Sequence, residues 1–361
     1  MTETAASPPA AEVAFGDGIV SALGARMREV GLEGRAFVVT HPEIAALHGG
    51  TVLEALDNAG YAPEVAAIQV GESSKSLSTA GELYAWLADG RAERRDTIVA
   101  LGGGVVGDLA GFIAATYLRG LRWVQVPTTV LAQVDSSVGG KVGVNLALGK
   151  NLIGAFHQPA VVLVDPLLLA TLPRREFRSG LYEVVKYGMI ASRSLFDRVA
   201  SDTKAIFARE EAVLVPAIVE SCRIKADIVT RDERESDLRR VLNYGHTVGH
   251  ALEAVTKYRR FRHGEAIGYG MLAAADLAVA RGALADTERQ ALAQLITLLG
   301  PLPPIADLPI GDVLDAVRRD KKVVHGRLHF VIAIQIGATM TVDDVTEDEL
   351  RAVLVRLGLK G

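Results

Sequence analysis

Cysteine is nearly absent from this chain, since Cys222 is the only one among 361 residues. One cysteine cannot form a disulfide within the chain, and it excludes a zinc site built from several thiolates, so this usage is typical of a reducing compartment. Long apolar runs are also absent, so no segment is expected to span a bilayer. Residues 1–13 have neither the basic nor the apolar segment of a secretory signal peptide. We therefore expect a cytoplasmic protein without a membrane anchor.

Excess charge of either sign is small as well. The chain has 39 Lys and Arg against 43 Asp and Glu, a formal net charge of -4. No segment is basic enough to indicate a nucleic-acid partner, and no basic amphipathic helix indicates binding to a membrane. Hydrophobic residues make up 49% of the chain, which is sufficient for two hydrophobic cores in a protein of this length.

Short β-branched runs alternate with helical patterns in the first half of the sequence. Such alternation predicts βαβ units and a largely parallel sheet. Helices are expected up to about residue 59 and over about 76–90. The expected strands are 36–40, 64–70, 97–101, 122–126 and 161–164.

The hydrophobic period changes near residues 171–173. From there to about residue 299 nearly every segment has a helical period, with expected breaks at Pro216 and at 261–264, where a new helix should begin. A proline-rich loop, a strand over 328–336 and a last helix over 347–357 should follow. We therefore expect an α/β protein. A Rossmann-like parallel-sheet domain should occupy residues 1–172, and a mainly α-helical domain should occupy residues 173–361.

A glycine-rich turn follows the third expected strand and opens a helix, over residues 101–108 (Leu-Gly-Gly-Gly-Val-Val-Gly-Asp). Glycine lets the backbone approach a phosphate, and a helix N-terminus offers free N–H groups and a favourable dipole. The turn therefore indicates pyrophosphate binding, although close packing of a helix on a strand would use the same residues. The spacing Gly-Gly-Gly-x-x-Gly departs from the usual dinucleotide fingerprint.

Two further loops follow expected strands and carry polar side chains. Residues 71–75 (Gly-Glu-Ser-Ser-Lys) combine a carboxylate with an ammonium group, and residues 127–129 (Pro-Thr-Thr) place hydroxyls at an expected helix start. Both loops are compatible with a bound nucleotide and also with ordinary N-capping of helices.

The sharpest local motif is Asn-Tyr-Gly-His-Thr-Val-Gly-His over residues 243–250. His246 and His250 are four residues apart, hence on one face of a helix with Cβ atoms roughly 6 Å apart. Two imidazoles so placed can share a metal ion. Thr247 stands where the helix of a zinc protease has its glutamate base, so a protease is disfavoured.

Three further residues are candidates for metal ligands. Glu253 is three residues beyond His250 on the same side of the helix, and His263 and Glu183 lie in separate segments. A lone histidine in a helix is usually a core or surface residue. The spacing therefore supports a metal site but does not select its ligands.

Basic residues recur inside or beside these motif segments. A single lysine is usually a solvated surface charge, but here the basic residues coincide with glycine-, asparagine- and histidine-rich segments. Together they predict a pocket for a substrate with more than one anionic group, such as a phosphate and a carboxylate. The residues concerned are Arg119, Lys141, Lys150, Lys186, Lys225, Arg239, Lys321 and Lys322.

In their order along the chain, these segments resemble one family, 3-dehydroquinate synthase, from about residue 71 to about residue 337. The matching segments are 102–108, 116–120, 127–141, 149–154, 183–186, 232–235, 242–250 and 263–265. The resemblance implies an NAD- and metal-dependent carbon–oxygen lyase of the shikimate pathway, which serves aromatic amino-acid biosynthesis. Its substrate would be the phosphorylated seven-carbon sugar acid DAHP, and its products 3-dehydroquinate and phosphate.

The chemistry implied by the resemblance uses NAD only transiently. NAD takes a hydride from the C5 carbinol of DAHP while the metal polarises the carbinol oxygen. The new ketone acidifies C6, so phosphate leaves by elimination, and NADH then returns the hydride. Ring opening and an intramolecular aldol reaction close the carbocycle. The enzyme is therefore expected to act as a lyase without net oxidation.

The resemblance also implies roles for single residues. Zinc or cobalt would be bound by Glu183, His246 and His263, so His250 would belong to the substrate pocket. NAD would contact Gly71, Glu72, Lys75, Gly104, Val105, Val106, Gly107, Asp108, Thr128, Thr129, Asp135, Lys141, Lys150 and Thr171. The catalytic residues would be Lys141, Lys186, Lys225, Glu235, Arg239, Asn243 and His250, with Lys186 and Glu235 near the metal or its water. Further substrate contacts would come from Asn151 and from one of Lys321 and Lys322. Arg119 would reach the phosphate site of a neighbouring subunit, which implies a homodimer.

Three alternatives remain open at this point. A sister sugar phosphate cyclase of the inosose or valiolone type would keep the NAD and metal sites but change the carboxylate pocket. Arg239, Leu242, Asn243 and His250 agree instead with the dehydroquinate type. A metal-dependent polyol dehydrogenase would release NADH, and a non-catalytic relative would not be expected to keep the three metal ligands.

Overall fold

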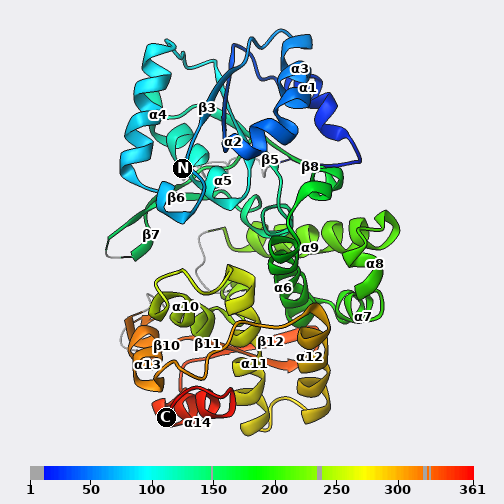
Figure 1. The fold of residues 1–361 in the computed structure, drawn as a ribbon, viewed down its shortest axis with the longest axis vertical. Coiled ribbons are helices and arrows are strands. Elements are labelled where there is room, and N and C mark those ends of the chain that lie inside the picture. The colour runs from blue at the N-terminus through cyan, green and yellow to red at the C-terminus, as the bar shows by residue number, and fades with distance from the viewer. Residues whose placement is uncertain (1–11, 148, 234–237, 320–322, 325–326) are drawn as a thin grey trace, which may run out of the picture. The chain divides into compact units, whose positions relative to one another are not determined.

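The computed structural model describes residues 12–147, 149–233, 238–319, 323–324 and 327–361, with only the backbone of 323–324 and 327–328. The chain divides into two compact units, Met1–Leu172 and Pro173–Gly361 (Figure 1). None of the helices in these described ranges is long and apolar enough to cross a membrane.

The first unit is built on a six-stranded sheet with the strand order β1-β8-β5-β4-β2-β3, and all of its pairings are parallel. Its strands are β1 (Glu12–Phe15), β2 (Ala36–Thr40), β3 (Glu64–Ala67), β4 (Thr97–Gly102), β5 (Arg122–Pro127) and β8 (Val161–Val164). The parallel sheet predicted from the sequence is thus confirmed. The strand expected over 64–70 is shorter than predicted, and β1 was not predicted.

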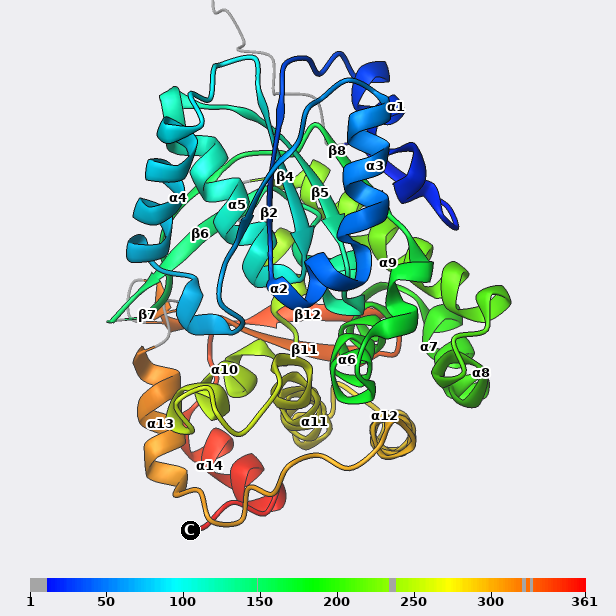
Figure 2. The ribbon, with the colours of Figure 1, turned by 45° about the horizontal axis from the view of Figure 1, so that its top comes forward.

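Helices cover both faces of this sheet (Figure 2). Phe37 and Val39 of β2 pack with α4 and α5 on one face, while Ala36 and Val38 pack with α1 and α3 on the other. A strand that is buried on both faces needs apolar residues at every position, which explains the continuous apolar run of β2. The helices are α1 (Leu23–Glu29), α2 (Pro42–Ile44), α3 (Gly50–Asn58), α4 (Leu77–Asp89) and α5 (Gly104–Thr116).

Shorter elements complete the first unit. An antiparallel ribbon is formed by β6 (Lys141–Leu146) and β7 (Gly149–Phe156). Two segments are π-helical, η2 (Ala45–Gly49) and η5 (Ala132–Ser136). The 3₁₀ turns are η1 (Ile19–Ala22), η3 (Glu72–Ser74), η4 (Tyr117–Arg119) and η6 (Pro166–Thr171).

The connections that leave β2 and β4 run in opposite directions along the sheet. β2 leads through α3 to β3, and β4 leads through α5 to β5 on its other side. Where neighbouring connections diverge in this way, the carboxyl ends of the two strands border a crevice in which ligands bind. β2 ends at Thr40 and β4 at Gly102, so the glycine-rich turn lies at this point.

The second unit is mainly helical, as predicted. Its helices are α6 (Arg174–Ala191), α7 (Arg193–Ser201), α8 (Thr203–Phe207), α9 (Glu211–Arg231), η7 (Leu238–Asn243), α10 (His246–Val255), α11 (His263–Ala280), α12 (Asp286–Leu299), α13 (Ile310–Arg319) and α14 (Glu347–Arg356). Two antiparallel pairs accompany them, β9 (Val323–Val324) with β10 (Arg327–Leu328) and β11 (Phe330–Gln335) with β12 (Ala338–Val342). Helix α11 is buried along most of its length and packs against α6, α10, α12, α14 and β11. It is therefore the centre of this unit.

The helix break expected at Pro216 is wrong, because α9 runs unbroken through that residue. Pro216 lies in the second turn, where its missing N–H removes one intrahelical hydrogen bond, the one to the Ala212 carbonyl. Buried side chains beyond it, such as Ile218 and Cys222, keep the helix packed. The new helix expected near 263 is confirmed, since α11 begins at His263.

Candidate functional site

Three helices of the second unit bring a carboxylate and two imidazoles together. Glu183 lies in the middle of α6, and His246 and His263 are the first residues of α10 and α11. The Oε1 atom of Glu183 is 3.6 Å from His246 Nε2 and 3.5 Å from His263 Nε2. The Glu183 side chain is completely buried. Such a carboxylate needs a cation close by, because an isolated buried charge is costly.

These separations fit the ligands of one metal ion. Zinc binds imidazole nitrogens and carboxylate oxygens at about 2.0–2.2 Å in tetrahedral geometry, which places neighbouring ligand atoms roughly 3.3–3.6 Å apart. Both separations from Glu183 Oε1 lie in this range. His250 adds a third imidazole, since one ring nitrogen each of His246, His250 and His263 lie within 4.8 Å of one another. The described residues therefore offer three imidazoles to a divalent cation, with the Glu183 carboxylate next to two of them.

The tautomer of His246 follows from its neighbour. His246 Nδ1 lies 3.1 Å from the backbone carbonyl oxygen of Tyr244. A carbonyl oxygen only accepts, so Nδ1 carries a proton and donates it, and Nε2, which faces Glu183, is the nitrogen available to a metal ion. This is the state in which an imidazole binds a metal ion.

The field at the cluster is strongly negative. Burial lowers the pKa of His263, but the charge of Glu253 and hydrogen bonds with Glu183 and Glu253 outweigh it and raise that pKa to about 10. Lys186, one turn along α6, forms an ion pair with Glu183 and is almost fully buried. The cluster thus attracts positive charge, and a divalent cation would displace a proton from it.

Glycines allow the three helices to approach one another. A Cβ atom on Gly264 would lie 1.8 Å from the Ser179 carbonyl oxygen of α6, and one on Gly270 would lie 1.7 Å from the Gly245 carbonyl oxygen at the start of α10. No side chain fits at either position. The convergence of Glu183, His246 and His263 therefore depends on these backbone contacts.

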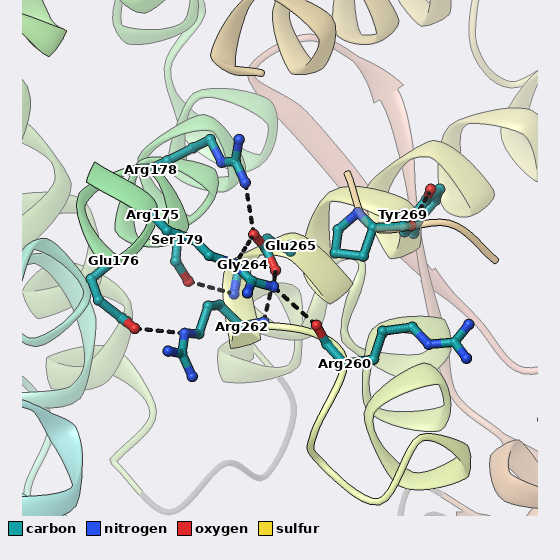
Figure 3. Close-up of polar contacts among 10 residues, drawn as sticks. Arg175, Glu176, Arg178, Ser179, Arg260, Arg262, Gly264, Glu265 and Tyr269 are labelled. Atoms are coloured by element: carbon teal, nitrogen blue, oxygen red, sulfur yellow. Dashed lines mark hydrogen bonds and ion pairs between the residues drawn. The ribbon is translucent and has the colours of Figure 1, made fainter. Parts of the chain in front are cut away.

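A buried carboxylate also ties the start of α11 to α6 (Figure 3). Glu265 accepts hydrogen bonds from Arg175 at 2.8 and 2.7 Å, from Arg178 at 2.8 Å and from the Arg262 backbone at 2.9 Å. Burial raises the pKa of Glu265, but these donors outweigh it and lower the pKa below its usual value. Gly264 N–H donates to Ser179 Oγ at 3.1 Å. Glu265 lies two residues after His263, so its contacts hold the start of α11 in place.

The remaining predicted residues of the second unit lie on elements that pack against α6. Lys225 is on α9 and Arg239 and Asn243 are on η7, and Lys225 and Arg239 are 7% and 3% exposed. Arg239 N–H donates to Asp232 Oδ2 at 3.0 Å. Glu235, Lys321 and Lys322 lie outside the described residues.

In the first unit, the glycine-rich turn has two functions. A Cβ atom on Gly107 would lie 2.1 Å from the Gln125 side chain, so this glycine serves the packing of α5 on β5. Gly103 and Gly104 lie at the start of α5, directly after β4, as an anion site requires. The hydroxyls of Thr128 and Ser136 are buried, and within the described chain neither has a hydrogen-bond partner. A bound nucleotide at the turn would supply one.

A polar network joins the loop after β3, helix α5 and the β6–β7 ribbon. Lys75 Nζ contacts Asp108 and Asn151. Asn145 Nδ2 donates to Glu72 Oε1 at 2.8 Å, its Oδ1 accepts from Asn151 N–H at 2.9 Å, and its own N–H donates to the Lys75 carbonyl oxygen at 2.8 Å. Sequence reasoning missed Asn145. The only signal is its position between the two segments 127–141 and 149–154.

The other predicted cofactor residues lie in several loops, strands and helices of the first unit. Lys150 is 3.6 Å from Glu72, and Thr129 Oγ1 accepts from Ala132 N–H at 3.0 Å, which is ordinary N-capping. Thr171 Oγ1 lies 2.9 Å from His48 Nε2. The remaining predicted cofactor residues are Gly71, which precedes η3, Val105 and Val106 in α5, Asp135 in η5 and Lys141 at the start of β6. Arg119, predicted to reach a neighbouring subunit, lies at the end of η4.

Comparison with known proteins points to one family. The 3-dehydroquinate synthase N-terminal model matches residues 65–179, and the 3-dehydroquinate synthase C-terminal model matches residues 180–323. A 3-dehydroquinate synthase of Pelotomaculum thermopropionicum is 48% identical over 336 residues, which are 93% of this chain and 91% of that protein.

Solved structures of sugar phosphate cyclases share the fold. ValA (2-epi-5-epi-valiolone synthase) from Streptomyces hygroscopicus subsp. jinggangensis 5008, with NAD+ and Zn2+ bound, is similar with a TM-score of 0.90 at 25% identity, over 99% of both chains. A 2-deoxy-scyllo-inosose synthase complexed with carbaglucose-6-phosphate, NAD+ and Co2+ has a TM-score of 0.84 at 25% identity, over 95% of both chains.

Proposed function

The chain belongs to the 3-dehydroquinate synthase family, and on that premise we propose that Glu183, His246 and His263 form its metal centre. It is an NAD- and metal-dependent lyase that converts DAHP to 3-dehydroquinate and phosphate in the shikimate pathway. The observation that carries the proposal is the pair of 3.6 and 3.5 Å separations between Glu183 Oε1 and the two Nε2 atoms.

The cofactors and the chain divide the chemistry. When bound, the metal supplies a Lewis acid and NAD a reversible hydride acceptor. Glu183, His246 and His263 would hold the metal, which we propose to be zinc or cobalt. Lys186, ion-paired with Glu183, would keep that carboxylate oriented and balance its charge. His250, whose ring centroid is 5.2 Å from that of His246, would contact the substrate beside the metal.

Buried cations would bind the anionic groups of the substrate. Lys225 and Arg239 are almost completely buried, and in such surroundings the attraction between a cation and a substrate anion is stronger than in water. The Arg239 guanidinium could bind a carboxylate through two parallel hydrogen bonds, with Asn243 beside it on η7. Proposed contacts also include Lys141 and Asn151, and, outside the described residues, Glu235 and one of Lys321 and Lys322.

The start of α5 would bind the pyrophosphate of NAD. The first turn of α5 follows the end of β4, where a ligand is expected, and the buried Thr128 hydroxyl follows the neighbouring strand β5. Glu72, Lys75 and Lys150 would hold the cofactor through the network that Asn145 organises. Thr129, Asp135, Lys141 and Thr171 complete the proposed set.

We also propose that the enzyme is a homodimer in which Arg119 acts on the partner's site. Leu118, Arg119 and Gly120 all have positive φ, 49°, 69° and 126°. Left-handed backbone at consecutive non-glycine residues is strained, and such strain is concentrated at functional sites. This kink presents an exposed arginine at the end of α5. The cytoplasmic location remains a prediction from the sequence.

Turnover of DAHP by the purified protein tests the function. We expect equal amounts of phosphate and 3-dehydroquinate without accumulation of NADH, loss of turnover on chelation, and recovery with zinc or cobalt. Activity on another sugar phosphate instead of DAHP would identify a sister cyclase, whose fold is shared but whose sequence identity is only 25%. Continuous NADH formation from a simple polyol would identify a dehydrogenase.

A further inference from the structure

Glu253 is a buried carboxylate next to one of the proposed metal ligands. It lies in the last turns of α10 and is 4% exposed. Its Oε2 atom is 3.2 Å from Nδ1 of His263, the first residue of α11. The contact therefore crosses the connection between the two helices that carry His246 and His263.

The imidazole of His263 is held between two carboxylates. Its Nδ1 edge faces Glu253 at 3.2 Å, and its Nε2 edge faces Glu183 at 3.5 Å. An ionised carboxylate only accepts hydrogen bonds, so Nδ1–H donates to Glu253, and Nε2 is the nitrogen that would give up its proton to a metal ion. His246 is oriented in the same way, but by the neutral carbonyl of Tyr244. One imidazole thus has a charged partner and the other has an uncharged one.

We propose, resting on the metal centre proposed above, that Glu253 is a positioning residue that orients His263 and strengthens its Nε2 as a ligand for the divalent cation. A negative charge behind an imidazole raises the basicity of the opposite nitrogen and fixes the tautomer that binds metal. Glu253 does not itself reach the cation, because it lies at the far edge of the ring. Its charge adds to that of Glu183 and offsets the cationic Lys186.

Glu253 could instead only support the packing of α10 on α11, and two substitutions separate these roles. E253Q keeps the volume and shape of the side chain and removes its charge. E253D keeps the charge and shortens the side chain, which leaves a void. A packing role predicts that E253D is the more damaging change, whereas a charge-dependent positioning role predicts the opposite order for metal affinity.

The test is the affinity of the metal-free protein for Zn2+ and Co2+, measured by competition with a chelating indicator. Loss of a hydrogen-bonded partner behind a histidine ligand typically weakens metal binding by about 10- to 100-fold. We expect E253Q to fall in this range and E253D to bind more tightly than E253Q. The Co2+ complex of each variant should keep its visible absorption bands, because the coordinating atoms are unchanged.

D276N is the matched control. Asp276 is also a buried carboxylate with a charged partner, Arg289 at 2.7 Å, and it lies on α11 several turns from His263. D276N should lower the melting temperature of the metal-free protein without changing its metal affinity. Equal affinities of E253Q and the unsubstituted protein, or tighter binding by E253Q than by E253D, would overturn the proposal. If E253Q does not fold, E253A, which also removes the charge, is compared with D276N, and the proposal fails if their affinities agree. A protein without any metal affinity would overturn the proposed function instead.

Discussion

Glu183 Oε1 lies 3.5 Å from His263 Nε2, although the two residues belong to different helices far apart in the sequence. The contact exists because α11 begins against the backbone of α6, at Gly264 and Ser179. Substitutions that change helix packing should therefore change metal affinity even when every proposed ligand residue is kept.

Gly264→Ala tests this dependence. Its Cβ atom would lie 1.8 Å from the Ser179 carbonyl oxygen, so α11 must move away from α6. We expect a loss of about 1–3 kcal/mol in the free energy of unfolding and a clear loss of zinc affinity. Gly311→Ala on α13, where nothing lies within 4 Å, is the control and should leave zinc affinity unchanged without lowering the free energy of unfolding. Unchanged zinc affinity in Gly264→Ala would contradict the packing argument.

The parallel sheet and the helical second half could be predicted from the sequence, because β2 is a continuous apolar run of strand length and α11 is a mostly apolar segment too long for a strand. The β6–β7 ribbon could not. Its strands contain Gly143 and Gly154, whose missing side chains allow the backbones to approach closely across the pair. Glycine lowers the strand propensity that sequence reasoning relies on. Asn145 was missed together with the ribbon that positions it.

Asn145→Ala should weaken the binding of NAD. The Asn145 side chain makes two hydrogen bonds, to Glu72 and to the Asn151 backbone, and its own backbone N–H makes a third, to Lys75, which alanine would keep. Loss of its side chain leaves partners unsatisfied at a cost of about 1–3 kcal/mol, so we expect the Kd for NAD to rise by about tenfold or more. Isothermal titration with NAD measures this effect, and the exposed Asn58→Ala serves as the control. Equal NAD affinity in the two variants would remove Asn145 from the cofactor site.

Mixing two inactive variants tests whether Arg119 acts on the partner subunit. In a mixed dimer of Arg119→Ala and His246→Ala, the site of the Arg119→Ala subunit keeps all its proposed metal ligands. It also receives the intact arginine of its partner. Random mixing should therefore restore about one quarter of the normal turnover. An arginine that acts within its own subunit would leave every site of the mixed dimers defective, and no activity would return.

Stability at acidic pH should depend on Glu349. Hydrogen bonds from Arg281 at 2.7 and 2.8 Å, helped by the Thr346 backbone, lower the pKa of Glu349 from 4.5 to about 2. A carboxylate whose pKa is lower in the folded protein stabilises it above the unfolded pKa, and this contribution is lost as pH falls from 4.5 toward 2. Because the pair is partly exposed, we expect E349Q to lower the unfolding free energy by about 1 kcal/mol at pH 7.

Urea unfolding of both proteins between pH 7 and pH 3 measures this difference, which should be constant above pH 5 and shrink below it. A difference that stays constant down to pH 3 would show that Glu349 is not the titrating group.

The three proposed ligands could be predicted from the sequence only through the family resemblance, because spacing within one helix favours His246 with His250. In the structure, Glu183 Oε1 lies 3.6 and 3.5 Å from ring nitrogens of two imidazoles that start two different helices. Such convergence is a property of tertiary packing, and no local pattern encodes it. The direction of each imidazole is likewise set by Tyr244 and Glu253, which bind the opposite ring nitrogens.

The most direct test of the account measures bound metal and DAHP turnover on the same samples of the unsubstituted protein, His246→Ala and His157→Ala. His157 lies in the first unit, where its ring stacks on Trp123, and controls for the loss of an imidazole. We predict that the unsubstituted protein and His157→Ala bind one metal ion per chain and turn over DAHP, while His246→Ala loses both together. Stoichiometric metal and full turnover in His246→Ala would contradict the proposed metal centre.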